Sequence, residues 1–256
     1  SQNISAMLEK ITAGPAAGFS KAGFPASQVP DLLSSIAFGA SANLGGLTSI
    51  TGISQASTSG FMGKITQSAN AAVGAVDVPN FTPSASLVQT ISSKISDKSV
   101  NALNQISAAD PNFTAANAKD AMKAISSGAI TGLNAWAQGK NINQSDLTAM
   151  FTEASKGVVS GLANLNAPWA AQITPSGISG ELSTANQSAF NSLGLSSTLA
   201  TTIKQATDSV AGSVAVPTYD ANTMKAKCEQ YGGTWDASRN FCAMPTFSTS
   251  LQPPKI

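Results

Sequence analysis

Apolar residues in the middle of the chain recur at every third or fourth position, and Ser, Thr, Asp and Lys fill most positions between them. This spacing places the apolar side chains on one face of a helix. Hydroxyl residues precede several of these stretches, and Gly or Pro ends them, as is usual for helix caps. The pattern predicts helices from Thr82-Pro83 to Ile106 and over Thr114–Trp136, Ser145–Leu165, Leu182–Leu193 and Ser197–Val214.

The two ends of the chain follow different patterns. Gly and Pro interrupt the first third, where we expect short helices over Asn3–Ala13 and Asp31–Phe38 and loose helix or coil over the uncharged stretch Leu32–Gly63. Near the C-terminus a short helix over Asp220–Tyr231 is followed by a hairpin between Gly232 and Ala243. The predicted fold is therefore mainly α, with loosely packed helices and a small C-terminal loop or hairpin.

These patterns divide the chain into three parts. We expect a Gly/Pro-interrupted N-terminal segment (1–80), a helical bundle (81–217), and a C-terminal cysteine loop with an extended tail (218–256). Pro79-Asn80-Phe81-Thr82 and Pro111-Asn112-Phe113-Thr114 each precede a predicted helix. They indicate either a duplication or one convenient helix entry used twice. Because no third copy follows, a solenoid is not expected.

Composition excludes several kinds of chemistry. The 256 residues contain no His and a single Arg, Arg239, and only 11% of them are charged, with a net charge of +1. Without His there is no Ser-His-Asp triad, no Cys-His dyad and no base that titrates near neutrality. No basic stripe is present to neutralise phosphates, so specific nucleic-acid binding is not expected. We predict a protein that is not an enzyme and has no cofactor.

The only two cysteines, Cys228 and Cys242, lie on either side of Gly232-Gly233 and Trp235. A disulfide between them would close a loop and stabilise it by about 3 kcal/mol in the chain-entropy model. Two free buried thiols are the alternative. A metal site is not expected, because two cysteines without His do not complete a zinc tetrahedron. A disulfide would favour an oxidising final location.

Three Gly-x-x-x-Gly spacings occur, at Gly14–Gly18, Gly128–Gly132 and Gly157–Gly161. Such spacing lets helices approach closely, above all in membranes. Since Gly is frequent here and the flanks are polar, coincidence is the simpler interpretation. The acidic residues are scattered, and none forms a spaced pair suited to acid–base catalysis.

The predicted outer faces of the helices carry mostly Ser, Thr, Asn, Gln and Ala. Helices with such faces are weak alone and depend on packing, because these polar residues are poor helix formers. A nearly neutral surface with few charges also promotes association. We therefore expect a subunit of a larger assembly, whose partners are other protein subunits or copies of itself.

The segment from Cys228 to Cys242, which contains Gly232-Gly233-Thr234-Trp235-Asp236, resembles small cysteine loops of exported and phage structural proteins. The overall composition is similar to that of bacteriophage virion proteins of the tail, baseplate or internal head. This resemblance implies a tail, hub or vertex component, assembled in the host cytoplasm and located in the virion. No secretory signal is expected at Ser1, and whether a leader was removed before Ser1 stays an open question.

Two alternatives stay open. One is a secreted, extracellular structural or adhesive protein, since Ser/Ala-rich helical spider silk has a similar composition. The other is a membrane-active ejection or pore-forming protein, based on the uncharged stretches Leu32–Gly63 and Leu182–Ile203. Membrane contact is the less favoured, because no run of about 18 apolar residues exists.

Overall fold

The computed structural model describes residues 7, 10–11, 14–19, 22–48, 54–217, 220–230, 234–237 and 241–243. Most of them are helical, which confirms the predicted mainly α class. The chain divides into two compact units, Ser1–Thr218 and Tyr219–Ile256. The residues on both sides of position 80 belong to the same unit.

The first unit contains nine described α-helices and several short 3₁₀ helices. The α-helices are α2 (Val29–Ala42), α3 (Leu44–Thr48), α4 (Gln55–Ala71), α5 (Ala85–Asn101), α6 (Leu103–Ala109), α7 (Ala115–Ala137), α8 (Gln144–Gly161), α9 (Pro175–Ser192) and α10 (Thr198–Ala211). The 3₁₀ helices are η1 (Pro15–Gly18), η2 (Ala26–Gln28), η3 (Ala72–Ala75), η4 (Leu162–Asn164) and η5 (Ala170–Gln172).

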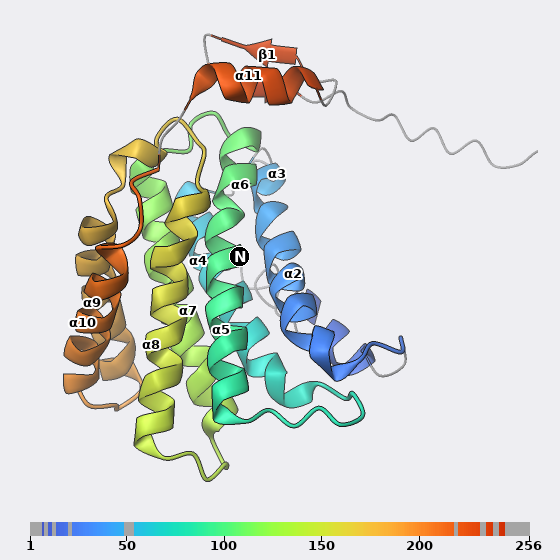
Figure 1. Cartoon of the computed structure of the whole chain (residues 1–256), viewed down its shortest axis with the longest axis vertical. Helices are drawn as coiled ribbons and strands as arrows, with labels where there is room; N and C mark the ends of the chain where they lie inside the picture. The colour runs from blue at the N-terminus through green and yellow to red at the C-terminus, as the bar shows by residue number, and fades with distance from the viewer. Residues whose placement is uncertain are drawn as a thin grey trace, which may run out of the picture. The chain divides into compact units, whose positions relative to one another are not determined.

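The long helices form two layers. In the first layer α2 packs on α5, α5 on α8, and α8 on α10, while in the second layer α4 packs on α7 and α7 on α9. Figure 1 shows α5 and α8 side by side, with α4 and α7 behind them. Helices α4 and α7 are parallel, because Gly63 and Gln67 of α4 lie against Gly128 and Gly132 of α7 in the same order.

The second layer repeats itself at a fixed interval. Helices α4, α7 and α9 begin at Gln55, Ala115 and Pro175, which are evenly spaced along the chain. Buried residues recur at the same interval and share their chemistry: Met62, Met122 and Leu182; Thr66, Ser126 and Asn186; Ala69, Ala129 and Ala189. In the first layer α2, α5 and α8 begin at Val29, Ala85 and Gln144. The unit is thus a stack of three helix pairs, closed by α10, of the kind that builds helical solenoids.

This stack corrects the expectation that a solenoid is absent. The two Pro-Asn-Phe-Thr segments precede α5 and α7, which lie in different layers. They are therefore entries to unlike helices and not copies of one unit. The true interval is longer and runs from the start of α4 to the start of α7, and from there to the start of α9. At the buried polar position the interval is preserved only as residue class, because Thr, Ser and Asn substitute for one another there.

Glycines set the distance between neighbouring helices. A Cβ on Gly128 would collide with the backbone of Gly63, and one on Gly157 would collide with the backbone of Ser93. A Cβ on Gly161 would lie 2.8 Å from Cβ of Val100. Two of the three Gly-x-x-x-Gly spacings therefore mark close packing of α7 on α4 and of α8 on α5, so coincidence and loose packing are both wrong for these helices. At Gly18 no side chain or distant backbone lies within 4 Å of a Cβ.

Helix starts differ in part from the sequence prediction. Thr114 caps α7 as expected, with its hydroxyl accepting from Asn117 N and the Asn117 side chain accepting from Thr114 N. Ser84, rather than Thr82, caps α5. Helix α9 begins well before Leu182, because Thr174 provides a cap and Pro175 takes the first helical position. Helix α4 overlaps only the end of the stretch Leu32–Gly63, where loose helix or coil is expected, and its buried face mixes Phe61, Met62 and Ile65 with Gly, Ser and Thr.

The second unit holds α11 (Ala221–Gln230) and a hairpin of β1 (Thr234–Asp236) and β2 (Phe241–Ala243). The hairpin is antiparallel, with Trp235 opposite Cys242, which confirms the predicted hairpin. The side chains of Cys228 and Cys242 lie outside the described residues, so their disulfide stays a prediction. The predicted helix Asn3–Ala13 also falls mostly outside the described residues.

Candidate functional site

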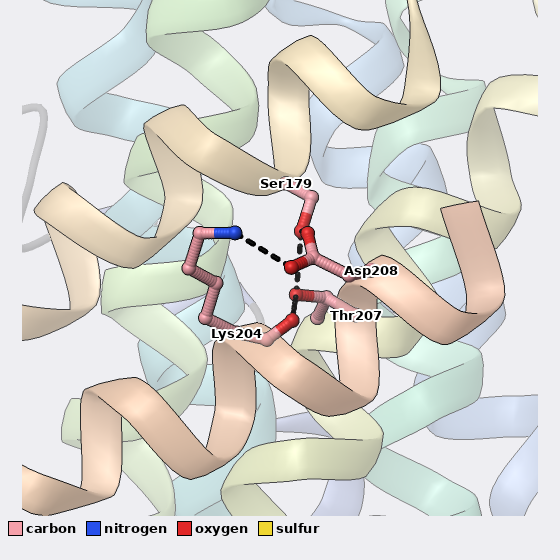
Figure 2. A network of polar contacts seen from close by, with 4 residues as sticks. All are labelled: Ser179, Lys204, Thr207 and Asp208. Carbon is pink, nitrogen blue, oxygen red and sulfur yellow. Dashed lines mark hydrogen bonds and ion pairs between the residues drawn. The ribbon is translucent and has the colours of Figure 1, made fainter. Parts of the chain in front are cut away.

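A network of polar side chains joins α9 to α10. Ser179 of α9 donates to Oδ1 of Asp208 at 2.7 Å, and its hydroxyl lies 2.7 Å from that of Thr207. Lys204 donates to Oδ2 of the same carboxylate at 2.6 Å. Figure 2 shows the four side chains converging between the two helices. Ser179 and Thr207 are buried, whereas Lys204 and Asp208 reach solvent.

The electrostatics of this network are those of a structural link between α9 and α10, called the clamp below, and not those of a catalytic base. The hydrogen bond from Lys204, followed by the one from Ser179, lowers the pKa of Asp208 below its ordinary value. A general base that works near neutrality needs a pKa near 7, and Asp208 is shifted in the opposite direction. The Ser179 hydroxyl is also fully buried. The network therefore binds two helices together and does not prepare Ser179 for attack.

A second polar cluster lies at the junction of α7, α8 and α9. Ser126 donates to Oδ1 of Asn186 at 2.8 Å, Asn186 Nδ2 donates to Ser155 at 3.1 Å, and the two serine hydroxyls are 3.1 Å apart. All three residues are at most 1% exposed. Because every member finds a partner, the cluster satisfies buried polar groups and fixes the relative positions of three helices.

A surface groove lies between the first halves of α8 and α10. It is open to solvent and has a volume of about 670 Å³. Its lining consists mostly of hydroxyl and amide side chains: Gln144, Ser145, Thr148, Ala149, Thr152, Glu153, Thr198, Leu199 and Thr202. In contrast to the glycine contacts of α5 with α8, this groove is lined by threonines from both helices.

Two threonines of the groove donate their hydroxyl protons to carbonyls of their own helices. Thr148 donates to the carbonyl of Gln144 at 2.7 Å, and Thr202 donates to that of Thr198 at 3.3 Å. Their remaining capacity is to accept. Glu153 is paired with Lys156 at 2.7 Å. These three side chains therefore offer acceptors to donors such as backbone N–H groups, hydroxyls and amides.

Sequence reasoning singled out the cysteine pair and missed the groove. The cysteines belong to α11 and β2 in the second unit, whereas the groove and both polar clusters lie in the first. The threonines at 148, 152, 198 and 202 carry no local signal, since Ser and Thr are frequent throughout the chain. Only the packing of α8 beside α10 brings them together.

The described ranges contain neither a cluster of metal-ligating residues nor a membrane-spanning helix. In that part of the chain no group of three or more His, Cys, Asp or Glu residues is placed to hold a metal ion. Over the same residues, no helix combines the length and the apolar character needed to cross a lipid bilayer.

The fold and these features define a charge-poor, two-layer stack of helix pairs with an open polar groove. No protein-family model, curated protein or solved structure matches the chain.

Proposed function

We propose that the chain is a non-enzymatic structural subunit of a larger assembly, and that its contacts with neighbouring subunits include the groove between α8 and α10. Composition favours a viral particle as that assembly, with the subunit serving as a tail, hub or vertex component. The observation that carries the proposal is the neutral, hydroxyl-rich surface around the groove. No charged residue lies between Glu181 and Lys204 in the sequence.

Physical reasons favour this surface for protein contacts. Short side chains such as Ser and Thr lose less rotamer freedom in an interface than Lys or Glu do. Neutral polar groups also cost less to desolvate than charges, provided that they find hydrogen-bond partners. The exposed residues of α9 and α10 include Thr184, Ser188, Asn191, Thr201 and Thr202, of which Thr202 lines the groove.

The rigidity of the stack supports the same role. Glycine contacts bring α4 onto α7 and α5 onto α8, and polar clusters join α7, α8, α9 and α10. A scaffold held in this way presents its surface in one arrangement, which lowers the ordering cost of association.

Self-association of the full chain tests the proposal. We expect light scattering to show a mass that rises with concentration, and the change Thr202→Arg to abolish the rise by filling the groove with a large charged side chain. The matched control is Thr90→Arg on α5, because Thr90 is also exposed and also donates to a carbonyl of its own helix, at 3.2 Å.

A chain that stays a cooperative monomer over the whole accessible concentration range would contradict assembly from copies of itself. Equal association of both variants would contradict the role of the groove. Turnover of a substrate by the pure monomer would contradict the non-enzymatic role.

A further inference from the structure

A second site lies at the end of α4 and α7, outside the α8–α10 groove. Trp136, in the last turn of α7, is 3% exposed, and its Nε1 has no hydrogen-bond acceptor among the described residues. An indole N–H buried without an acceptor is uncommon and costs free energy. The indole N–H is therefore free to donate to a bound group.

Gly74 opens a notch beside this indole. Gly74 lies in η3, directly after α4, and is exposed. A Cβ placed on Gly74 would lie 3.3 Å from Cδ1 and 3.7 Å from Nε1 of Trp136. Because Gly has no such atom, the nitrogen edge of the ring borders a small space instead of a side chain.

Lys140 supplies a positive charge to the same space. Its Nζ lies 4.0 Å from the position of the absent Gly74 Cβ and 5.4 Å from the centre of the Trp136 ring. Within the described part of the chain, the ammonium contacts this ring and forms no ion pair. Two donors, one charged and one buried, therefore both lie within 4.0 Å of the position of the absent Gly74 Cβ.

We infer that Gly74, Trp136 and Lys140 form a binding site for a carboxylate group. One carboxylate oxygen accepts from Nε1 of Trp136, and the ammonium of Lys140 balances the charge. Charge-assisted hydrogen bonds of this kind are stronger than neutral ones. The exposed Lys140 side chain is long and moves aside to admit the group.

Two physical terms compete with this binding. The C-terminal end of α7 carries a partial negative charge that repels an anion, but the positive charge of Lys140, just beyond that end, offsets it. An ordered water could also satisfy Nε1. Water alone gives no response to added carboxylate, so the two explanations differ in a measurable way.

The test follows the indole N–H resonance of Trp136 in the full, isotope-labelled chain. The chain has three Trp residues, and Trp136→Phe identifies the resonance. The probes are sodium acetate, the capped peptide acetyl-Gly-Glu-Gly-amide and its Gln counterpart, each compared with sodium chloride at equal ionic strength. We expect a saturable shift with acetate and with the Glu peptide only. Tighter binding of the Glu peptide than of acetate assigns the carboxylate to a protein partner, and the reverse assigns it to a small free acid.

Variants separate binding from folding. Lys140→Gln will weaken carboxylate binding about tenfold, the order expected for loss of a charge-assisted hydrogen bond. Lys98→Gln, which removes an exposed charge on α5, will leave it unchanged. Gly74→Ala will fill the notch and abolish the shift while the chain keeps its helical circular dichroism and cooperative unfolding. A Trp136 resonance that does not respond, responds equally to chloride, or responds equally in Lys140→Gln would overturn the inference. These outcomes are independent of the α8–α10 groove.

Discussion

Glycines, which have no Cβ, allow neighbouring helices of this protein to approach closely. Gly128 faces the backbone of Gly63, and Gly157 faces that of Ser93. Glycine inside a helix costs about 0.5–1 kcal/mol relative to Ala. Its presence at these contacts is explained by packing, because any Cβ would force the two helices apart.

Gly128→Ala will destabilise the protein by about 1–3 kcal/mol, the usual cost of overpacking. Urea unfolding followed by circular dichroism measures the loss. Gly180→Ala on α9 is the matched control, since no atom outside its own helix lies within 4 Å of a Cβ there. The control will gain about 0.5–1 kcal/mol from better helix propensity. Equal stability of the two variants would show that the glycine contact does not limit the packing.

Asn186→Ala will cost about 1–3 kcal/mol, because Ser126 and Ser155 would each lose a buried hydrogen-bond partner. The same unfolding measurement applies. Asn191→Ala, on the exposed side of the same helix, will change stability by less than about 0.5 kcal/mol. A loss as small as that of the control would mean that a water takes the place of the amide.

At the scale of whole elements, polar contacts join helices that apolar packing alone would leave free to slide. The core contains many Ala, Ser and Gly positions, whose small side chains interlock less than Leu or Ile would. Hydroxyl contacts occur between α4 and α5 (Thr66 with Ser99) and between α9 and α10 (Ser179 with Thr207). Each of these two helix pairs is thereby held in one register.

The clamp between α9 and α10 will make stability depend on pH. In the folded protein the pKa of Asp208 lies below its ordinary value of 3.8. The ionised carboxylate therefore contributes its full stabilisation above pH 3.8, and this contribution is lost as the pH falls through the lowered folded-state pKa. Asp208→Asn will lower the urea midpoint at neutral pH, and its difference from the unmodified chain will shrink below pH 3.8. The effect will be small and will decrease with salt, because the carboxylate is 45% exposed. A difference that is constant with pH would contradict the assignment.

At the scale of the whole molecule, the stack of helix pairs and the C-terminal hairpin belong to separate compact units. All three helix pairs and α10 lie in the first unit. The outer positions of α10, such as Thr201, Gln205 and Ser209, are exposed and polar on the helix that ends the stack.

A chain that ends at Thr218 will therefore fold alone. We expect its thermal midpoint to match that of the main transition of the full chain, and its helical signal per residue to be unchanged or higher. Differential scanning calorimetry of both chains provides the comparison. A large drop in the midpoint would show that the second unit contributes to the stability of the first.

Much of the helical content could be predicted from sequence, and the exceptions have physical causes. Helix α7 follows a clear apolar stripe and ends at Ala137, directly after the predicted end at Trp136. Helix α4 buries Phe61, Met62 and Ile65 only in its middle, and its remaining contacts, like those of the first turns of α9, use small or hydroxyl residues that a pattern of apolar positions does not detect. The carboxylate site was equally hidden, since Gly74 is far in sequence from Trp136 and Lys140.

By itself the sequence determined the helical class, most helix positions, the C-terminal hairpin and the shortage of charge, because these depend on local periodicity, caps and composition. Only the tertiary structure decided the two layers, the regular repeat of helix pairs, the helices that glycine brings into contact, and the residues that share a groove or a polar cluster. The physical reason is that these features depend on which small side chains meet across space. Ser, Thr, Ala and Gly are too frequent in this chain for their spacing to indicate those meetings.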